Sequence, residues 1–123
     1  MQKTIILLLS LSLFSSAEKR TDTFYSTTYH ACLKGVSNPD KCIEDELTFQ
    51  DKKLNLAYQK ARKAIQPFRR EALKEVQRVW IRYRDKKCHF FYHKESGSGG
   101  LSDALACELE ETMRRAKELE ALY

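Results

Sequence analysis

The stretch Val76–Cys88, VQRVWIRYRDKKC, contains the chain's only tryptophan, a dense set of basic residues and a cysteine on one continuous helical pattern. Its apolar positions recur every three or four residues, which is the spacing of an α-helix that buries one face. The pattern continues in both directions, from about Phe68 to His93. We therefore predict a long helix here and interpret it as the central helix of a small helical protein, with Trp80 in the core.

Helical patterns also precede and follow this stretch. Residues from Pro39 to Gln66 predict a long helix that ends at a proline, because proline lacks the N–H that helix hydrogen bonding needs. The glycine-rich segment Ser96–Gly100 predicts a loop, and a last helix is expected from about Ser102 to Leu122. A shorter helix is expected within Phe24–Leu33. The predicted fold class is all-α: a small antiparallel bundle of three main helices plus a short N-terminal one.

The start of the chain has the pattern of a secretory signal peptide. A charged beginning, Met1-Gln-Lys3, is followed by the uncharged apolar run Ile5–Phe14 and then by Ser15-Ser16-Ala17. We expect residues 1–17 to be removed and residues 18–123 to form one domain in the periplasm or outside the cell. The apolar run is too short for a permanent span, so no stable membrane anchor is expected after cleavage.

Four cysteines in a small exported chain indicate two disulfides rather than a metal site. Short connections between long helices predict antiparallel hairpins, which fixes the register of facing positions. With the second hairpin turning near residues 97–98, Cys88 and Cys107 face each other. Cys32 and Cys42 bracket a short turn. The predicted pairs are therefore Cys32–Cys42 and Cys88–Cys107.

The same register brings polar side chains from three helices into one layer. Asp51, Arg84 and Thr112 each lie on an otherwise apolar inward stripe. A buried carboxylate needs a partner, and arginine can offer it two donors. We therefore predict an Asp51–Arg84 ion pair completed by Thr112 or Asn55. The preferred interpretation is a structural layer that fixes helix register; the alternative is a functional cluster in a groove.

Three motifs in this chain resemble a known family. They are DxxLNxxY from Asp51 to Tyr58, QxxWIxYRDxxC from Gln77 to Cys88, and a spaced GG…C…T…R..EL ending from Gly99 to Leu119. Together they resemble the LprI-type lysozyme-inhibitor domain of bacterial exported proteins, over about Cys32 to Leu119. The resemblance implies a protein partner, namely lysozyme or another cell-wall hydrolase.

The residues themselves give no sign of an enzyme. No nucleophile elbow, phosphate-cradling loop or spaced CxxC pair is present, so no catalytic residue, cofactor or metal is expected. His89 and His93 stand four apart and could supply two metal ligands, but two surface histidines are the preferred interpretation. Nucleic acid is not an expected partner, because the chain is exported and lacks a recognition motif.

Two surfaces remain as candidates for binding. Basic residues repeat every four positions along the long central stretch and could meet an anionic envelope component, although a solvated face is the simpler interpretation: Arg70, Lys74, Arg78, Arg82 and Lys86. The predicted glycine-rich loop could act as a wedge for an enzyme cleft, or be a plain connector. The candidate partner-binding residues are His89, Tyr92, Lys94, Gly97, Gly99 and Gly100.

The leading hypothesis is an inhibitor of lysozyme or a related cell-wall hydrolase that acts by steric occlusion. The alternative, from another class, is an envelope interaction or structural module with no hydrolase target. A third interpretation is metal or anion binding through the histidines and the basic row.

Overall fold

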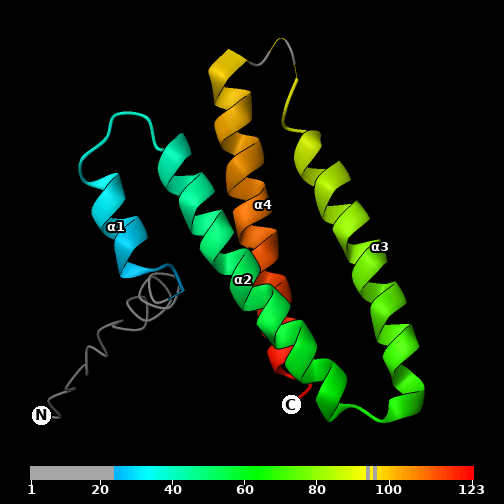
Figure 1. Ribbon diagram of the computed structural model, residues 1–123. Coiled ribbons are helices and arrows are strands. Elements are labelled where there is room, and N and C mark those ends of the chain that lie inside the picture. The colour runs from blue at the N-terminus through cyan, green and yellow to red at the C-terminus, as the bar shows by residue number, and fades with distance from the viewer. Residues whose placement is uncertain (1–23, 94, 96) are drawn as a thin grey trace, which may run out of the picture.

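The computed structural model describes residues 24–93, 95 and 97–123. The predicted signal peptide lies outside these residues, as does Lys94. The described chain is all-α, as predicted, with α1 (Thr27–Leu33), α2 (Asp40–Ala64), the 3₁₀ turn η2 (Pro67–Arg69), α3 (Arg70–His89) and α4 (Gly97–Glu120) (Figure 1). Within this part of the chain, none of the helices has both the length and the apolar content needed to cross a bilayer.

The ends of α2 follow from local chemistry. At its beginning, the Asn38 side chain accepts a hydrogen bond from the Asp40 amide at 2.9 Å, which satisfies one of the unpaired first-turn donors. Asp40 also places a negative charge where the helix dipole favours it. At its other end the backbone leaves the helical region at Ile65 and Gln66, ahead of Pro67. Proline disfavours helix at the residue before it, so α2 stops where the sequence predicts.

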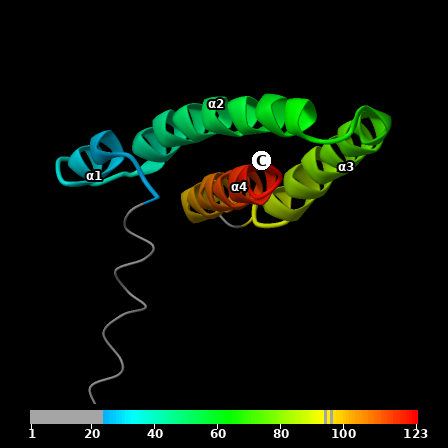
Figure 2. The same ribbon diagram turned by 90° about the horizontal axis from the view of Figure 1, so that it is seen from below.

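The centre of the molecule is the pair α2 and α4, not α3. Figures 1 and 2 show α4 running alongside α2, with α3 set off to one side of the pair. The buried cluster comes from these two helices alone: Leu54, Ala57, Ala61, Ala116 and Leu119. Three of the five are alanines, whose small side chains let two helix backbones approach closely.

The prediction that α3 is the central helix is therefore wrong. Only Gln77 and Cys88 of α3 are buried, while Val76 and Tyr83, two apolar residues of the stretch Val76–Cys88, are 52 % and 54 % exposed. Trp80 is partly buried and packs against the edge of the α2–α4 core. Its bulk, together with that of Arg84, holds α3 away from a pair of helices that meet through alanines.

The boundary of α4 also differs from the prediction. Gly97–Gly100, expected in a loop, form the first turn of the helix. Gly97 has a φ of +62°, a conformation that favours glycine, so the chain reverses direction there and then enters the helix. The hydroxyl of Ser102 donates a hydrogen bond to Asp40 Oδ1 on α2, and Gly100 is buried. These contacts with the rest of the fold outweigh the low helix propensity of glycine.

Both predicted disulfides are present. Cys32–Cys42 joins α1 to α2 across Cα atoms 5.8 Å apart, and Cys88–Cys107 joins α3 to α4 across 5.4 Å. The short helix α1 has no buried residue, and α3 has only two. Each disulfide thus ties a weakly packed helix to the α2–α4 pair.

A buried polar network on α2 holds the segment before α1. The carboxylate of Glu46 accepts hydrogen bonds from the Ser26 amide at 2.9 Å and from the Ser26 hydroxyl. The Gln50 amide donates to Glu46 at 2.7 Å and to the Phe24 carbonyl at 3.0 Å. Both α2 side chains are almost inaccessible to solvent. A buried carboxylate is tolerated here because it is fully hydrogen-bonded.

We expect Glu46→Ala to destabilise the protein by about 1–3 kcal/mol, because buried donors on Ser26 and Gln50 lose their acceptor. Urea unfolding followed by circular dichroism measures the change. The matched control is Glu44→Ala, an exposed carboxylate on the same helix turn, which should cost less than about 0.5 kcal/mol. Equal effects of the two substitutions would show that the network contributes nothing to stability.

Candidate functional site

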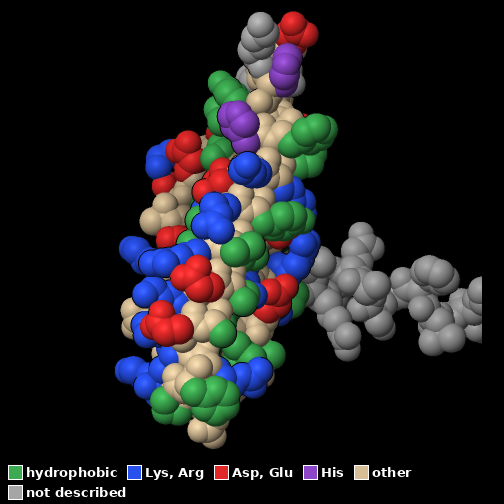
Figure 3. All heavy atoms as spheres, turned by 90° about the vertical axis from the view of Figure 1, so that its right-hand side faces the viewer, with side chains coloured by type: hydrophobic (Ala, Val, Ile, Leu, Met, Phe, Trp, Pro, Cys, Tyr) green, Lys and Arg blue, Asp and Glu red, His purple; other side chains and the backbone are tan. Residues whose placement is uncertain are grey.

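The connection from α3 to α4 exposes a cluster of aromatic side chains, which we call the aromatic tip: His89, Phe90, Phe91 and Tyr92. The last turn of α3 tightens there, with the Phe91 amide bonded to the Cys88 carbonyl at 3.1 Å and the Tyr92 amide to the His89 carbonyl at 3.0 Å. This tight turn leaves the rings exposed to solvent, and Phe90 is 83 % exposed. In Figure 3, histidine and hydrophobic side chains stand together at the upper end of α3.

A groove runs beside the aromatic tip, between the end of α3 and the start of α4. It has a volume of about 560 Å³ and is lined by Asp85, Lys86, His89, Tyr92, Leu101, Ala104, Leu105 and Glu108. His89 and Tyr92, two predicted partner-binding residues, thus lie together on its wall. Gly97 and Gly99 belong to the first turn of α4 and do not line it, while Gly100 is buried. Lys94 lies outside the described residues.

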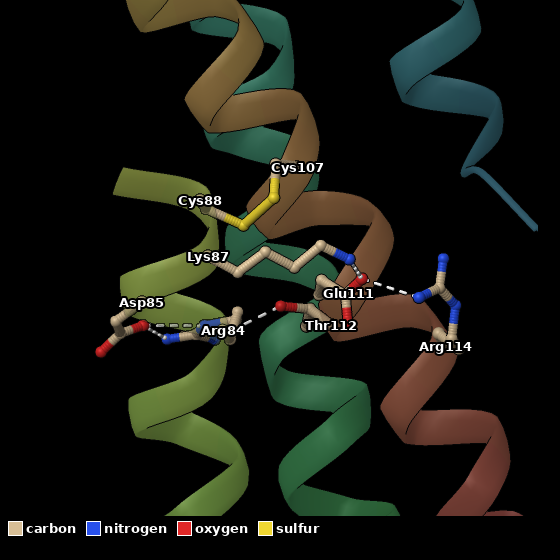
Figure 4. The surroundings of a disulfide bond; sticks show 8 residues. All are labelled: Arg84, Asp85, Lys87, Cys88, Cys107, Glu111, Thr112 and Arg114. Carbon is tan, nitrogen blue, oxygen red and sulfur yellow. Dashed lines mark hydrogen bonds and ion pairs between the residues drawn. A yellow bond between two sulfur atoms is a disulfide. The ribbon is translucent and has the colours of Figure 1, made fainter. Parts of the chain in front are cut away.

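The aromatic tip is fixed to α4 by the adjacent disulfide and by an ion-pair cluster (Figure 4). Lys87 Nζ lies 2.5 Å from Glu111 Oε1, and Arg114 reaches the same oxygen at 2.7 Å. Glu111 is buried. The hydrogen bond that Lys87 donates to Glu111, assisted by the charge of the carboxylate, raises the pKa of Lys87 against the opposing effect of desolvation. The ion-pair cluster was not predicted from the sequence, because nothing in the local sequence distinguishes Glu111 from the other acidic residues around it.

We expect stability to fall as pH rises above about 10. In the folded protein burial raises the pKa values of Tyr25 and Tyr29 above 10.0, and Glu111 raises that of Lys87 above 10.5. A group whose pKa is raised by folding stabilises the fold below its unfolded pKa and loses that contribution as pH climbs through its folded pKa. Urea midpoints measured from pH 8 to 11 should therefore stay level and then decline.

Two substitutions separate the contribution of Lys87 from that of the two tyrosines. Lys87→Met should show a shallower alkaline decline, whereas Lys86→Met, at an exposed neighbour, should follow the natural protein. If the urea midpoints of all three proteins decline in the same way with pH, Lys87 does not contribute to the loss of stability.

The predicted polar layer is present in part. Arg84 donates to Thr112 Oγ1 at 3.3 Å, and Thr112 is fully buried. The predicted Asp51–Arg84 ion pair is wrong: Arg84 pairs at 2.9 Å with Asp85, its neighbour on α3. Asp51 accepts a hydrogen bond from Asn55 at 3.3 Å. Because α3 stands off from α2, a hollow of about 310 Å³ lined by Asp51, Asn55 and Arg84 separates the two helices.

Two guanidinium groups lie close to the Trp80 ring. The Cζ atoms of Arg84 and Arg115 lie 5.3 Å and 5.9 Å from the ring, within the range of cation–π attraction. Arg115 donates from Nε to Gln77 at 2.9 Å and pairs with Glu118 at 2.8 Å. Both arginines are thus held by partners on α3 and α4, which supports the structural interpretation of this layer. The sequence signal for Arg115 and Gln77 was their place in the spaced motifs.

The basic row along α3 is partly neutralised. Lys74 lies 3.5 Å from Glu71, and Arg78 lies 2.9 Å from Glu75. Exposed pairs of this kind contribute little to stability, but they reduce the field that a ligand would meet. Among the described residues, no group of three or more histidine, cysteine, aspartate or glutamate side chains is arranged to hold a metal ion.

Comparison with known proteins identifies the family. The family described as lysozyme inhibitor LprI matches residues 32–119, which is more than half of the chain and includes both disulfides. No curated protein and no solved structure matches. The chain belongs to the lysozyme inhibitor LprI family.

Proposed function

We propose that this protein inhibits lysozyme or a related cell-wall hydrolase by placing the aromatic tip in the mouth of the enzyme's cleft. The observation that carries the proposal is the aromatic tip itself: Phe90 is 83 % exposed on a tight turn directly after Cys88 of a disulfide. Contiguous exposed apolar patches on soluble proteins mark interaction surfaces, and aromatic residues are enriched in binding hot spots. A turn held by a disulfide loses little conformational entropy on binding.

The surroundings of the aromatic tip suit a cleft that contains carboxylates. Glycoside hydrolases use a pair of carboxyl groups at the cleaved bond. Lys86 and His89 lie on the groove wall beside the aromatic rings and can face such carboxylates. The formal net charge of the chain is +5, so it should associate faster with a neutral or acidic hydrolase than with a strongly basic one.

The family and the two disulfides fit an extracytoplasmic protein. We propose that the segment before the described residues, 1–17, is the export signal and that residues 18–123 act in the periplasm or outside the cell. Mass spectrometry of the protein purified from its envelope fraction should find an N-terminus near Glu18. A retained segment 1–17 would contradict this proposal.

Inhibition assays test the function directly. The oxidised protein is incubated with a panel of lysozymes and bacterial lytic enzymes on insoluble peptidoglycan and, in parallel, on a soluble glycan substrate. We expect at least one enzyme to be slowed on both substrates at micromolar protein. If no enzyme is slowed, the inhibitor proposal is wrong.

The second candidate function is an envelope interaction module. The observation that favours it is the outer face of α3, where Val76, Val79 and Tyr83 are exposed beside cations such as Arg82. A protein that coats the wall would slow hydrolysis of insoluble peptidoglycan and leave the soluble substrate untouched. The two-substrate design therefore separates this function from cleft occlusion.

A further inference from the structure

The end of the molecule opposite the aromatic tip carries a basic hollow. It lies where α2 passes into α3, has a volume of about 380 Å³ and is lined by Gln59, Arg62, Lys63 and Arg70. Three of these four side chains are cations and the fourth is an amide. Among the residues that the structure describes, no carboxylate lines the hollow. In Figure 3, Lys and Arg side chains gather at the lower end of α3, around this turn.

Arg62 is the most unusual member of this site. Its Nε atom is buried and has no hydrogen-bond partner within the described structure. Its guanidinium lies 5.9 Å from the Tyr58 ring and makes no ion pair with a described residue. Arginine is rarely left in this state, because a buried donor without an acceptor lowers stability. An anion in the hollow would supply a countercharge to the Arg62 guanidinium, which has no carboxylate partner among the described residues.

The charge at this turn is not neutralised by neighbours. Among the described residues, Lys63 and Arg69 have no acidic partner, and the nearest acidic residue in sequence, Glu71, pairs with Lys74. Elsewhere in the molecule, Arg78, Arg84 and Lys87 each pair with a carboxylate. The end of the α2 dipole is negative and the start of the α3 dipole is positive, so the two largely cancel. The side-chain cations therefore set the local field.

Arg70 is already positioned for a ligand. Its Nε donates to the Arg62 carbonyl at 2.8 Å, which fixes the plane of the guanidinium. No described residue accepts a hydrogen bond from its two terminal nitrogens. A fixed, planar pair of donors matches two oxygens of a phosphate group, and Lys63 adds a third cation.

We propose that this hollow binds a phosphate group, carried by a soluble or polymeric phosphate or by a lipid headgroup. The site is distinct from the aromatic tip and does not depend on the inhibitor function. Its chemistry is that of two guanidinium groups, Arg62 and the hydrogen-bonded Arg70, with Lys63 beside them. Gln59 offers an amide donor for a further oxygen.

Calorimetric titration with inorganic pyrophosphate at low ionic strength tests the site. The pocket variant Arg62→Gln/Arg70→Gln should bind about tenfold or more weakly than the natural protein. The control Arg82→Gln/Lys86→Gln removes two cations that have no acidic partner among the described residues and lie outside the hollow, and should change affinity less than about twofold. Equal losses in both variants, or no saturable binding by the natural protein, would overturn the proposal.

Folding and ligand source are controlled separately. If the pocket variant loses its helical circular dichroism, Lys63→Gln replaces it, since Lys63 is exposed, with an expected loss of about threefold. Sedimentation with phosphatidylglycerol vesicles that requires the pocket and is competed by pyrophosphate assigns a lipid headgroup. Pyrophosphate binding without sedimentation assigns a soluble or polymeric phosphate. Hydrolase inhibition by the pocket variant should be unchanged, so failure of this site and failure of the inhibitor function are distinguishable.

Discussion

Replacing the α3–α4 disulfide, Cys88→Ala/Cys107→Ala, should destabilise the protein by about 3 kcal/mol and release α3 from the other helices. The first part follows from the loop that the bridge closes, with a sequence separation of 19. The second part follows from packing, because Gln77 and Cys88 are the only buried residues of α3. A helix with so little buried surface depends on its covalent link. Amide exchange in α3 should accelerate more than exchange in α2 or α4.

The chain contains its own control for this experiment. Cys32→Ala/Cys42→Ala removes the other disulfide, which closes a loop with a sequence separation of 10. Its loss of stability should be similar, but the released element is α1, and the aromatic tip stays in place. Inhibition should therefore be lost in the first variant and kept in the second. Unchanged α3 exchange in Cys88→Ala/Cys107→Ala would contradict the role given to that disulfide.

Phe90→Ala should weaken hydrolase inhibition by about thirtyfold or more, the range of an aromatic hot spot worth about 2 kcal/mol or more. Its effect on stability should stay within about 0.5 kcal/mol, because the ring packs little against the fold. The inhibition constant and the urea midpoint are measured on the same samples.

Phe68 is the matched control, because it is also 83 % exposed and lies at the opposite end of α3. Phe68→Ala removes the same amount of exposed aromatic surface and should leave the inhibition constant unchanged. If the two substitutions weaken inhibition equally, the effect belongs to general hydrophobicity, and the aromatic tip has no special role.

The helices and disulfides could be predicted because their signals are local or follow from short turns. Pro67 marks the end of α2, and the register of a tight hairpin is enough to place Cys88 opposite Cys107. His89 and Tyr92 could be nominated for the candidate site because they flank the predicted turn. The precise start of α4 could not be predicted from the sequence, because it depends on the contact between Ser102 and Asp40, which are 62 residues apart in sequence.

The closeness of helix packing could not be predicted from the periodicity of apolar residues. A repeating apolar pattern shows which face of a helix is buried, but it does not show how closely two helices approach. Ala57, Ala61 and Ala116 decide that α2 and α4 form the central pair. Trp80 was predicted in the core, but it is only partly buried and packs against the α2–α4 cluster, and its size keeps α3 at the edge.

Polar partners were the hardest to predict. The predicted helix register placed Asp51 and Arg84 in one layer. In the structure, the Arg84 guanidinium pairs instead with Asp85, the next residue on α3. Glu46 and Gln50 looked like ordinary surface residues of a long helix. Their partners, Ser26 and Phe24, lie 20 and 26 residues away, and no local pattern links them.

Hydrogen exchange of the protein with and without an inhibited hydrolase tests whether the aromatic tip is the surface that binds the enzyme. Residues 88–93 and 97–105, which carry the aromatic tip and the opposite wall of its groove, should exchange more slowly in the complex. The turn at Pro67–Arg69 should be unaffected. Protection confined to the α2–α3 hollow around Asp51, with none at the aromatic tip, would contradict binding of the hydrolase by the aromatic tip.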